Sequence, residues 1–412
     1  MQGRLSHIIQ EKFAQYYNTY AMNVLSPSFI GQREFGFVPF NTHTRKIMLR
    51  HKKFENVESL KDFLASTVSS DVYYSAAYYE RPEADMDEKG WRGADLVFDI
   101  DADHIPTPCG KVHDSWVCNH CGFSCKGPSP EQCPTCGEAK FDTKTWMCDE
   151  CLESAKKETI KLLDMLIEDL GFAENEIRLY FSGNRGYHVH VESKQIHLLD
   201  SMARKEIVDY VIGLGFKVEL HRLIDKDKGR VVVGPNSKGW RSRIAKGIDS
   251  FLTKQSHGEI EAVGLSKPRI DFLIKNKEKL RESLKNKGWI EVKGVGPQNW
   301  KKIIQWIVNQ QSAKIDTVVT TDIHRLIRLA GSLHGKTGFM KLESPLTSFD
   351  EFDPLKEAVA FKEGQMIVKV TEAPKFRIGD IYYGPFKDNS HVELPTAAAL
   401  FLLCKGAAQV VD

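Results

Sequence analysis

Two aspartates separated by a single residue are the first candidates for chemistry in this sequence. Asp99 and Asp101 lie in a run, residues 95–101, whose apolar and acidic side chains alternate. Alternation is typical of a β-strand and would place both carboxylates on one face, roughly 6–7 Å apart at Cα. Carboxylate oxygens are ligands that Mg²⁺ and Mn²⁺ prefer, and the pair could bind one ion or bridge two. The alternative is the solvated polar face of an edge strand.

Two basic, glycine-containing segments could bind phosphate. Residues 182–190 read SGNRGYHVH; glycine lets a backbone turn approach a ligand, and Arg185 suits bidentate phosphate binding. The alternative there is a simple hairpin turn with an exposed arginine. In residues 316–338, the apolar spacing from Ile323 to Ala330 predicts a helix, followed by the loop HGKTG. A P-loop would stand between a strand and a helix, whereas this loop follows a predicted helix, which disfavours a P-loop. The alternative to a phosphate-binding loop is an ordinary helix and loop with solvated charges.

Eight of the nine cysteines lie between Cys109 and Cys151. Two Cys-x2-Cys pairs have the spacing of a tetrahedral zinc ribbon, with the ligands Cys118, Cys121, Cys133 and Cys136. The flanking residues could close a second zinc site, formed by Cys109, His113, Cys148 and Cys151. Zinc held by four protein ligands would be structural. Cys125 is then spare and could replace His113, and a redox pair or an iron–sulfur cluster are the alternatives.

The elements that must position these residues indicate an α+β fold. Helical periodicity over residues 5–20 and 153–170 is mixed with short strand-like segments, without a regular βαβ series. Residues 251–311 are Lys-rich and amphipathic without clear strands, which predicts a helical insertion. We therefore divide the chain into a catalytic domain in three parts and two insertions. The catalytic parts are 1–108, 152–252 and 312–412; the zinc-binding insertion is 109–151 and the helical insertion is 253–311.

Composition limits the classes of function. The 412 residues are 42% apolar and 27% charged, which is ordinary for a folded protein with a large core. The net charge of +2 means that any contact with nucleic acid must come from local patches. Candidates are residues 238–243 and the lysines of the helical insertion, Lys275, Lys277, Lys279, Lys285 and Lys287. No apolar run approaches the ~20 residues of a membrane span and no secretory signal is evident, so we expect an intracellular protein.

Taken together, these motifs resemble the small catalytic subunit of the archaeal–eukaryotic primase family. The segments that carry the resemblance are, in chain order, residues 32–37, 73–75, 96–101, 182–188, 325–328 and 332–338. They span most of the chain, and the last two have the form of the archaeal members. The resemblance implies the catalytic fold of this family with an inserted zinc-binding module and a helical insertion.

The resemblance also implies roles for individual residues. Asp99, Asp101 and Asp316 resemble the metal-binding carboxylates of the family, with Asp322 as the alternative to Asp316. The groups that resemble its triphosphate-binding residues are Ser182, Arg185, His188, Arg328, His334 and Lys336. Asn184 departs from members that have a second arginine at this position. The ribbon of Cys118 to Cys136 goes beyond the zinc knuckle of the family.

These observations predict a DNA-dependent primase that synthesises short primers on single-stranded DNA during replication. Two Mg²⁺ or Mn²⁺ ions held by the acids would serve nucleotidyl transfer. The resemblance implies nucleoside triphosphates as substrates and a heterodimer with the large primase subunit; an archaeal member would be cytoplasmic and nucleoid-associated. The alternatives are a repair or extension polymerase of the same family, a non-catalytic zinc-dependent nucleic-acid-binding subunit, and a metal-dependent hydrolase.

Overall fold

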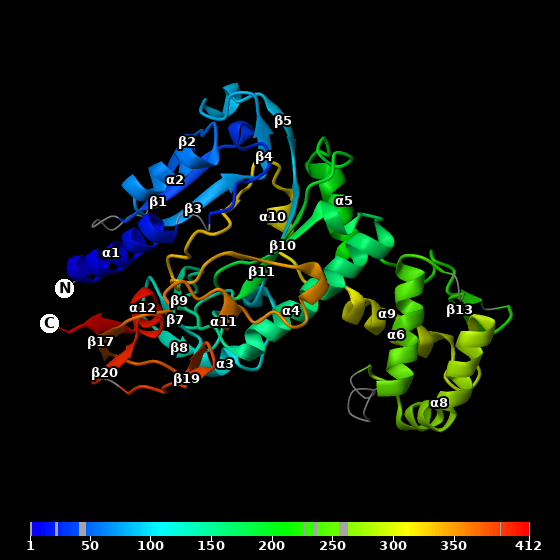
Figure 1. Cartoon of the computed structure of the whole chain (residues 1–412). Coiled ribbons are helices and arrows are strands. Elements are labelled where there is room, and N and C mark those ends of the chain that lie inside the picture. The colour runs from blue at the N-terminus through cyan, green and yellow to red at the C-terminus, as the bar shows by residue number, and fades with distance from the viewer. Residues whose placement is uncertain are drawn as a thin grey trace. The chain divides into compact units, whose positions relative to one another are not determined.

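The computed structural model describes residues 2–20, 24–40, 47–225, 227–234, 237–254, 263–387 and 389–411. The chain separates into two compact units, drawn in Figure 1. Unit 1 comprises residues 1–159, 174–205 and 315–412, and unit 2 comprises residues 160–173 and 206–314. Both units mix helices with strands, in agreement with the predicted α+β class.

The first sheet of unit 1 has four antiparallel strands in the order β15-β3-β1-β2. Their bounds are Leu326–Arg328 (β15), Ser69–Ser75 (β3), Phe35–Pro39 (β1) and Leu49–Lys52 (β2). Aromatic side chains such as Phe35 and Phe37 are fully buried, as expected for strand residues that pack against a helical layer. That layer consists of α1 (Gln2–Tyr20) and α2 (Val57–Ser66); α1 contacts both α2 and β3.

The second sheet has the order β16-β10-β11-β6 and is also antiparallel. The strands are Leu342–Ser344 (β16), Ile177–Phe181 (β10), Gly186–Val191 (β11) and Leu96–Asp101 (β6). The register places His188 opposite Asp99 and Gly186 opposite Asp101. A Cβ atom at Gly186 would lie 2.0 Å from the Ile100 carbonyl oxygen, so only glycine fits where these strands meet.

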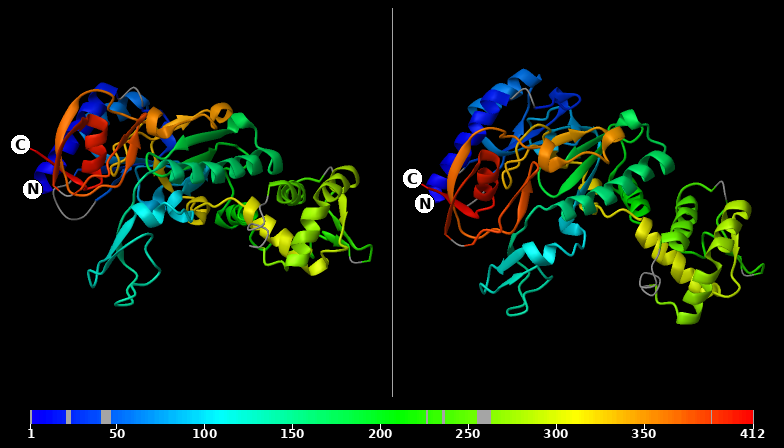
Figure 2. Two further views of the ribbon diagram at one scale, coloured as in Figure 1. Left: turned by 90° about the horizontal axis from the view of Figure 1, so that it is seen from below. Right: turned by 60° about the horizontal axis from the view of Figure 1, so that its bottom comes forward.

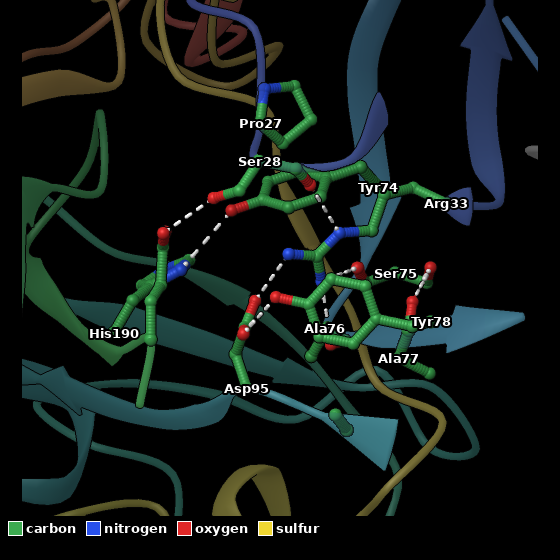
Figure 3. Close-up of polar contacts among 12 residues, drawn as sticks. Pro27, Ser28, Arg33, Tyr74, Ser75, Ala76, Ala77, Tyr78, Asp95 and His190 are labelled. Atoms are coloured by element: carbon green, nitrogen blue, oxygen red, sulfur yellow. Dashed lines mark hydrogen bonds and ion pairs between the residues drawn. The ribbon is translucent and has the colours of Figure 1, made fainter. Parts of the chain in front are cut away.

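A buried polar network joins the two sheets (Figure 3). Arg33, just before β1, forms an ion pair of 2.6 Å between Nη2 and Oδ2 of Asp95, which directly precedes β6. Between β3 and β11, the Tyr74 hydroxyl lies 3.2 Å from Nδ1 of His190. These contacts fix the strand that carries Asp99 and Asp101 relative to the first sheet.

The helix predicted from Ile323 to Ala330 is wrong. A short helix, α10 (Thr317–Thr321), ends before this segment, and the chain then forms β15, in which Ile327 lies opposite Tyr74 of β3. Pairing with a distant strand overrides a local apolar spacing that resembles a helix, and β-branched Ile327 suits that pairing.

Three further regions complete unit 1. The Cys-rich segment forms a small lobe with a sheet of order β8-β7-β9, visible in cyan in Figure 2. Its strands are Ser115–Cys118 (β7), Ser124–Lys126 (β8) and Phe141–Lys144 (β9). A C-terminal sheet of order β20-β17-β21 packs against an apolar helix, α12. These elements are Gln365–Val370 (β17), Ser390–Pro395 (β20), Ala408–Val410 (β21) and Thr396–Cys404 (α12).

The remaining elements of unit 1 are short strand pairs and helices. The pairs are Ala77–Tyr79 (β4) with Trp91–Ala94 (β5), and Phe376–Ile378 (β18) with Ile381–Tyr383 (β19). The helices are Gly110–His113 (α3), Asp149–Asp164 (α4), Ser201–Val211 (α5) and Pro354–Glu357 (α11), of which α4 and α5 extend into unit 2. No helix among the described residues is long and apolar enough to cross a membrane.

Unit 2 is built on three helices and a three-stranded sheet of order β12-β13-β14. The helices are Trp240–Lys254 (α6), Lys267–Lys287 (α8) and Pro297–Gln311 (α9), and the strands are Ile224–Asp225 (β12), Arg230–Val232 (β13) and Trp289–Glu291 (β14). The expectation that residues 251–311 contain no strand is therefore wrong, because β14 pairs with a strand outside that range. In the basic segment 238–243, Trp240 and Arg243 are buried, which removes both from a DNA-binding surface.

Candidate active site and metal centres

Three carboxylates meet at the end of β6. The backbone N–H of Asp316 donates to the Asp99 carbonyl oxygen at 2.8 Å, and this contact brings the start of α10 to the strand of Asp99 and Asp101. Burial, together with the negative charges of Asp101 and Asp316, raises the pKa of Asp99 to about 7. A divalent cation would relieve this repulsion, and an all-oxygen donor set fits Mg²⁺ or Mn²⁺. Asp316 and Asp322 each accept a hydrogen bond at 2.9 Å from the backbone N–H two residues later, but the acids that raise the pKa of Asp99 are Asp101 and Asp316.

The two basic loops predicted from the sequence lie side by side. The Thr337 hydroxyl donates to the Gly183 carbonyl oxygen at 2.6 Å. Gly183 has φ of +88°, and a Cβ atom there would lie 2.9 Å from the Cβ of His334. Glycine is needed at this contact because of both its conformation and its lack of a side chain. The approach of the loops gathers their polar groups next to the acidic cluster.

Arg185 is almost fully buried and held from one side. Its Nη1 donates to Oδ2 of Asp114 at 2.8 Å and to the Trp146 carbonyl oxygen at 3.2 Å, and its Nη2 pairs with Asp103. Its Nε is buried without a hydrogen-bond partner in the described part of the chain. A buried donor without a partner is costly, so this nitrogen is available for an anion that enters the site.

His188 lies between the acids and the basic loops as a neutral group. Its Nε2 is 3.6 Å from Oδ1 of Asp99, and its Nδ1 is buried with no partner among the described residues. Burial and the nearby cations, led by Lys341, lower the pKa of His188 well below its usual value. It can therefore exchange hydrogen bonds with a bound phosphate but would contribute no charge.

The other predicted phosphate-binding groups are also placed around these loops. Arg328 on β15 is buried, and its Nη1 forms an ion pair of 2.8 Å with Oδ1 of Asp71. The same carboxylate oxygen accepts from the Gly335 N–H at 3.1 Å, which anchors the loop of His334 and Lys336. His334 Nδ1 accepts from the Lys336 N–H at 3.2 Å, and the Lys336 side chain is exposed. Ser182 Oγ accepts from the Asn184 N–H at 3.3 Å.

Lys405, which sequence reasoning missed, joins this cationic group from the end of α12. Its Nζ donates to Oδ1 of Asn184 at 3.4 Å. Burial and the charges of Arg185 and Lys336 lower the pKa of Lys405 to about 7. A single lysine after an apolar helix carries no local signal, and only the return of α12 to the loop reveals its position.

Two clusters of cysteine and histidine have the geometry of metal sites. The ligand atoms within each cluster all lie within 4.8 Å of one another: Cys109, His113, Cys148 and Cys151 form one, and Cys118, Cys121, Cys133 and Cys136 form the other. These are the two sets predicted from the spacing, and each can hold a metal ion such as zinc. Cys125 is exposed on β8 and belongs to neither cluster.

The first cluster is linked to Arg185, in the loop that joins β10 and β11, through one carboxylate, that of Asp114. His113 Nδ1 lies 2.7 Å from Oδ1 of Asp114, while Oδ2 of Asp114 accepts from Arg185. A metal-binding histidine is commonly oriented by a carboxylate at its second nitrogen. Asp114 therefore positions a metal ligand and Arg185 at the same time, a connection that no sequence pattern indicated.

Comparison with known proteins agrees with this arrangement. The family described as DNA primase small subunit matches residues 139–347 of the chain. A DNA primase small subunit from Methanothrix thermoacetophila is 34% identical over the full length of both chains. Those from Archaeoglobus fulgidus and Cenarchaeum symbiosum are 33% and 32% identical over 97% of each chain.

The relatives show that the chain is a nucleotidyltransferase, and its structure places an acidic cluster beside two basic loops. The chain belongs to the DNA primase small subunit family, and it is the catalytic subunit of a DNA primase. The predicted resemblance to this family and the predicted primase function are thus confirmed.

Proposed function

We propose that this site joins nucleoside triphosphates into primers on a single-stranded DNA template during replication, within a heterodimer with a large primase subunit. The observation that carries the proposal is the meeting of Asp99, Asp101 and Asp316 beside the two basic loops. Nucleotidyl transfer requires neutralisation of charge and in-line positioning rather than covalent chemistry by the protein. An acidic cluster next to cationic donors supplies both.

The three carboxylates would hold two Mg²⁺ or Mn²⁺ ions, which supply activation of the attacking 3′-hydroxyl and neutralisation of the triphosphate. Arg185, Lys336 and Arg328 would bind the phosphate oxygens, with Ser182 and His334 at the edges of the pocket. His188, neutral at physiological pH, would donate a hydrogen bond from its free ring nitrogen to a phosphate oxygen. Because Asp114 fixes one side of Arg185, the guanidinium presents Nε without reorganisation.

The test is synthesis without a primer on single-stranded DNA, with nucleoside triphosphates and Mg²⁺ or Mn²⁺. We expect short new strands that depend on the template. Products only from a pre-annealed primer would indicate an extension polymerase, and triphosphate cleavage without template would indicate a hydrolase. DNA binding without any incorporation would indicate a non-catalytic subunit.

We also propose that the two Cys clusters each hold a structural zinc ion, within an insertion at residues 109–151. Their sulfur atoms lie close together, for example 3.3 Å between Cys109 and Cys151 and 3.5 Å between Cys118 and Cys136, as the ligands of one tetrahedral ion must. The helical insertion, predicted at 253–311, would correspond to the core of unit 2. The two clusters should differ in their effect on catalysis, because only the first contacts Arg185 through Asp114.

Cys148→Ser should remove one of two zinc ions per chain and raise the KM for nucleotide about 10-fold, since loss of the ion frees His113 and loosens Asp114. Cys136→Ser should also remove one ion but leave the KM within about 2-fold of wild type. Metal analysis by mass spectrometry and steady-state primer synthesis provide the two measurements. Equal kinetic effects of both variants, or a single zinc ion in the wild type, would contradict this proposal.

Lys405→Met should raise the KM for nucleotide about 10-fold with little change in kcat, because one charged phosphate contact is lost. Since the pKa of Lys405 lies near 7, phosphate binding must take up a proton at higher pH. Wild-type affinity should therefore fall as pH rises above 7, and the variant should lack this component. Lys362→Met, at an exposed site, is the control, and Lys405→Arg should retain affinity. A wild-type KM for Lys405→Met would refute the contact.

A further inference from the structure

Positive charge is concentrated in one part of the chain. Residues 206–314, which form most of unit 2, contain 22 Lys and Arg against 12 Asp and Glu. The remaining residues contain 35 Lys and Arg against 43 Asp and Glu, as the totals of 57 and 55 require. A net charge of +10 in one segment and −8 elsewhere is hidden in the overall value of +2. Such asymmetry is typical of proteins that bind polyanions through one domain.

Within unit 2, two adjoining hollows form a basic groove. The first, of about 330 Å³, lies between α8 and β14, and the second, of about 480 Å³, lies between β14 and the start of α9. They share Glu291 and Lys293 in their walls. The charged residues that line the groove are Lys228, Arg230, Lys279, Lys287 and Lys293, against Glu282 and Glu291. Lys228, Lys279, Lys287 and Lys293 are exposed and Arg230 is half-buried, and none of the five forms an ion pair within 4.0 Å among the described residues.

An aromatic side chain lines one of the two hollows of the groove. Trp289, the first residue of β14, is half-buried and lines the first hollow. The Arg230 guanidinium carbon lies 3.6 Å from the centroid of its ring, and Lys287 Nζ lies 5.2 Å from it. An indole can stack against a nucleic-acid base, and the cations next to it can contact the phosphates of the nucleic-acid backbone.

The structure sorts the lysines of α8 onto two faces. Lys279 and Lys287 line the groove, whereas Lys277 and Lys285 do not, because residues two apart on a helix point in nearly opposite directions. On that other face Arg281 pairs with Asp249 of α6 at 2.9 Å. The sequence offered five lysines of α8 equally, Lys275 among them, and of these five only Lys279 and Lys287 line the hollow with Trp289.

We propose that this groove of unit 2, which includes Trp289, is a binding surface for single-stranded nucleic acid. Its cations would contact the phosphates, and the indole would stack against a base. The surface would be a second contact site for the nucleic-acid strand. This site is separate from the acidic cluster and does not take part in the chemistry there.

The test compares two double variants of the full chain with the same change in charge. Binding to a fluorescent oligothymidylate of about 30 nucleotides is measured by anisotropy between about 50 and 200 mM salt. Lys279→Glu with Lys287→Glu should weaken binding at least ~10-fold and reduce the slope of log affinity against log salt by about 1 to 2. Lys277→Glu with Lys285→Glu should change affinity less than about 2-fold.

Trp289→Ala should weaken binding about 5-fold or more, and Trp289→Phe should restore much of the loss because stacking is kept. Thermal melting of each variant establishes that it is folded. Equal weakening by both lysine pairs would overturn the proposal in favour of bulk charge. If the groove variants bound the oligonucleotide as tightly as the wild type, the nucleic-acid proposal would also be overturned. The basic groove would then fit an acidic protein instead. Equal losses for duplex and single-stranded DNA would overturn the single-strand assignment.

Discussion

Asp99→Asn is expected to reduce primer synthesis by roughly 10³-fold or more, because it removes a charged oxygen ligand from the centre of the acidic cluster. Asp99 lies between the other two acids: Asp101 follows it on β6, and the Asp316 N–H binds its carbonyl oxygen. The amide is nearly isosteric, so the strand pairing of β6 with β11 should persist. The measurement is primer synthesis on single-stranded DNA at saturating nucleotide and Mn²⁺ or Mg²⁺.

The same substitution should not destabilise the protein. The pKa of Asp99 is raised from about 3.9 in the unfolded chain to about 7 in the fold. Its ionisation therefore lowers the free energy of unfolding progressively as pH rises from about 4 to about 7. Asp99→Asn lacks this loss, so at pH 8 without divalent ions it should melt at the wild-type temperature or above. Added Mn²⁺ should then raise the melting temperature of the wild type more than that of the variant.

Asp87→Asn, at an exposed position, is the matched control and should leave both activity and melting unchanged. Retention of wild-type synthesis by Asp99→Asn would exclude Asp99 as a metal ligand. A large fall in the melting temperature of Asp99→Asn would instead show that the carboxylate stabilises the empty site, contrary to its raised pKa.

Arg33→Met should lower the free energy of unfolding by about 3–5 kcal/mol, because it leaves a buried carboxylate without its cation. The side chains of Arg33 and Asp95 are each only 1% exposed. Arg33 also donates from Nη1 to the carbonyl oxygens of Ser75 and Ala76 at 3.0 and 2.7 Å (Figure 3). The Tyr78 hydroxyl donates to Oδ1 of Asp95 at 2.6 Å, which compensates only part of the lost charge.

Urea unfolding followed by circular dichroism measures this effect, with Arg81→Met as the control. Arg81 and Glu88 form an ion pair of 3.8 Å whose side chains are 58% and 68% exposed, so its loss should cost less than about 1 kcal/mol. In the Arg33→Met background, Asp95→Asn should cost less than it does in the wild type, since the two residues act as a pair. If Arg33→Met and Arg81→Met lowered the free energy of unfolding equally, the Arg33–Asp95 ion pair would not stabilise the junction of the two sheets.

Local patterns in the sequence predicted much of the fold around the site. The alternation at residues 95–101 predicted β6, because this signal repeats within a few residues. The cysteine spacing likewise predicted both metal-binding sets, since each set consists of two pairs whose members are separated by only two or three residues. The roles of the acidic and basic site residues stay predictions until the variants are measured.

Local sequence therefore specifies which kinds of side chain are available and which short elements carry them. Only the folded structure shows that residues 326–328 form a strand on β3, that Asp316 lies beside Asp99, and that Lys405 contacts Asn184. It also decided which lysines of α8 share a face with Trp289. Each of these depends on contacts between distant segments, whose free energy comes from packing and pairing and leaves no periodic trace in the local sequence.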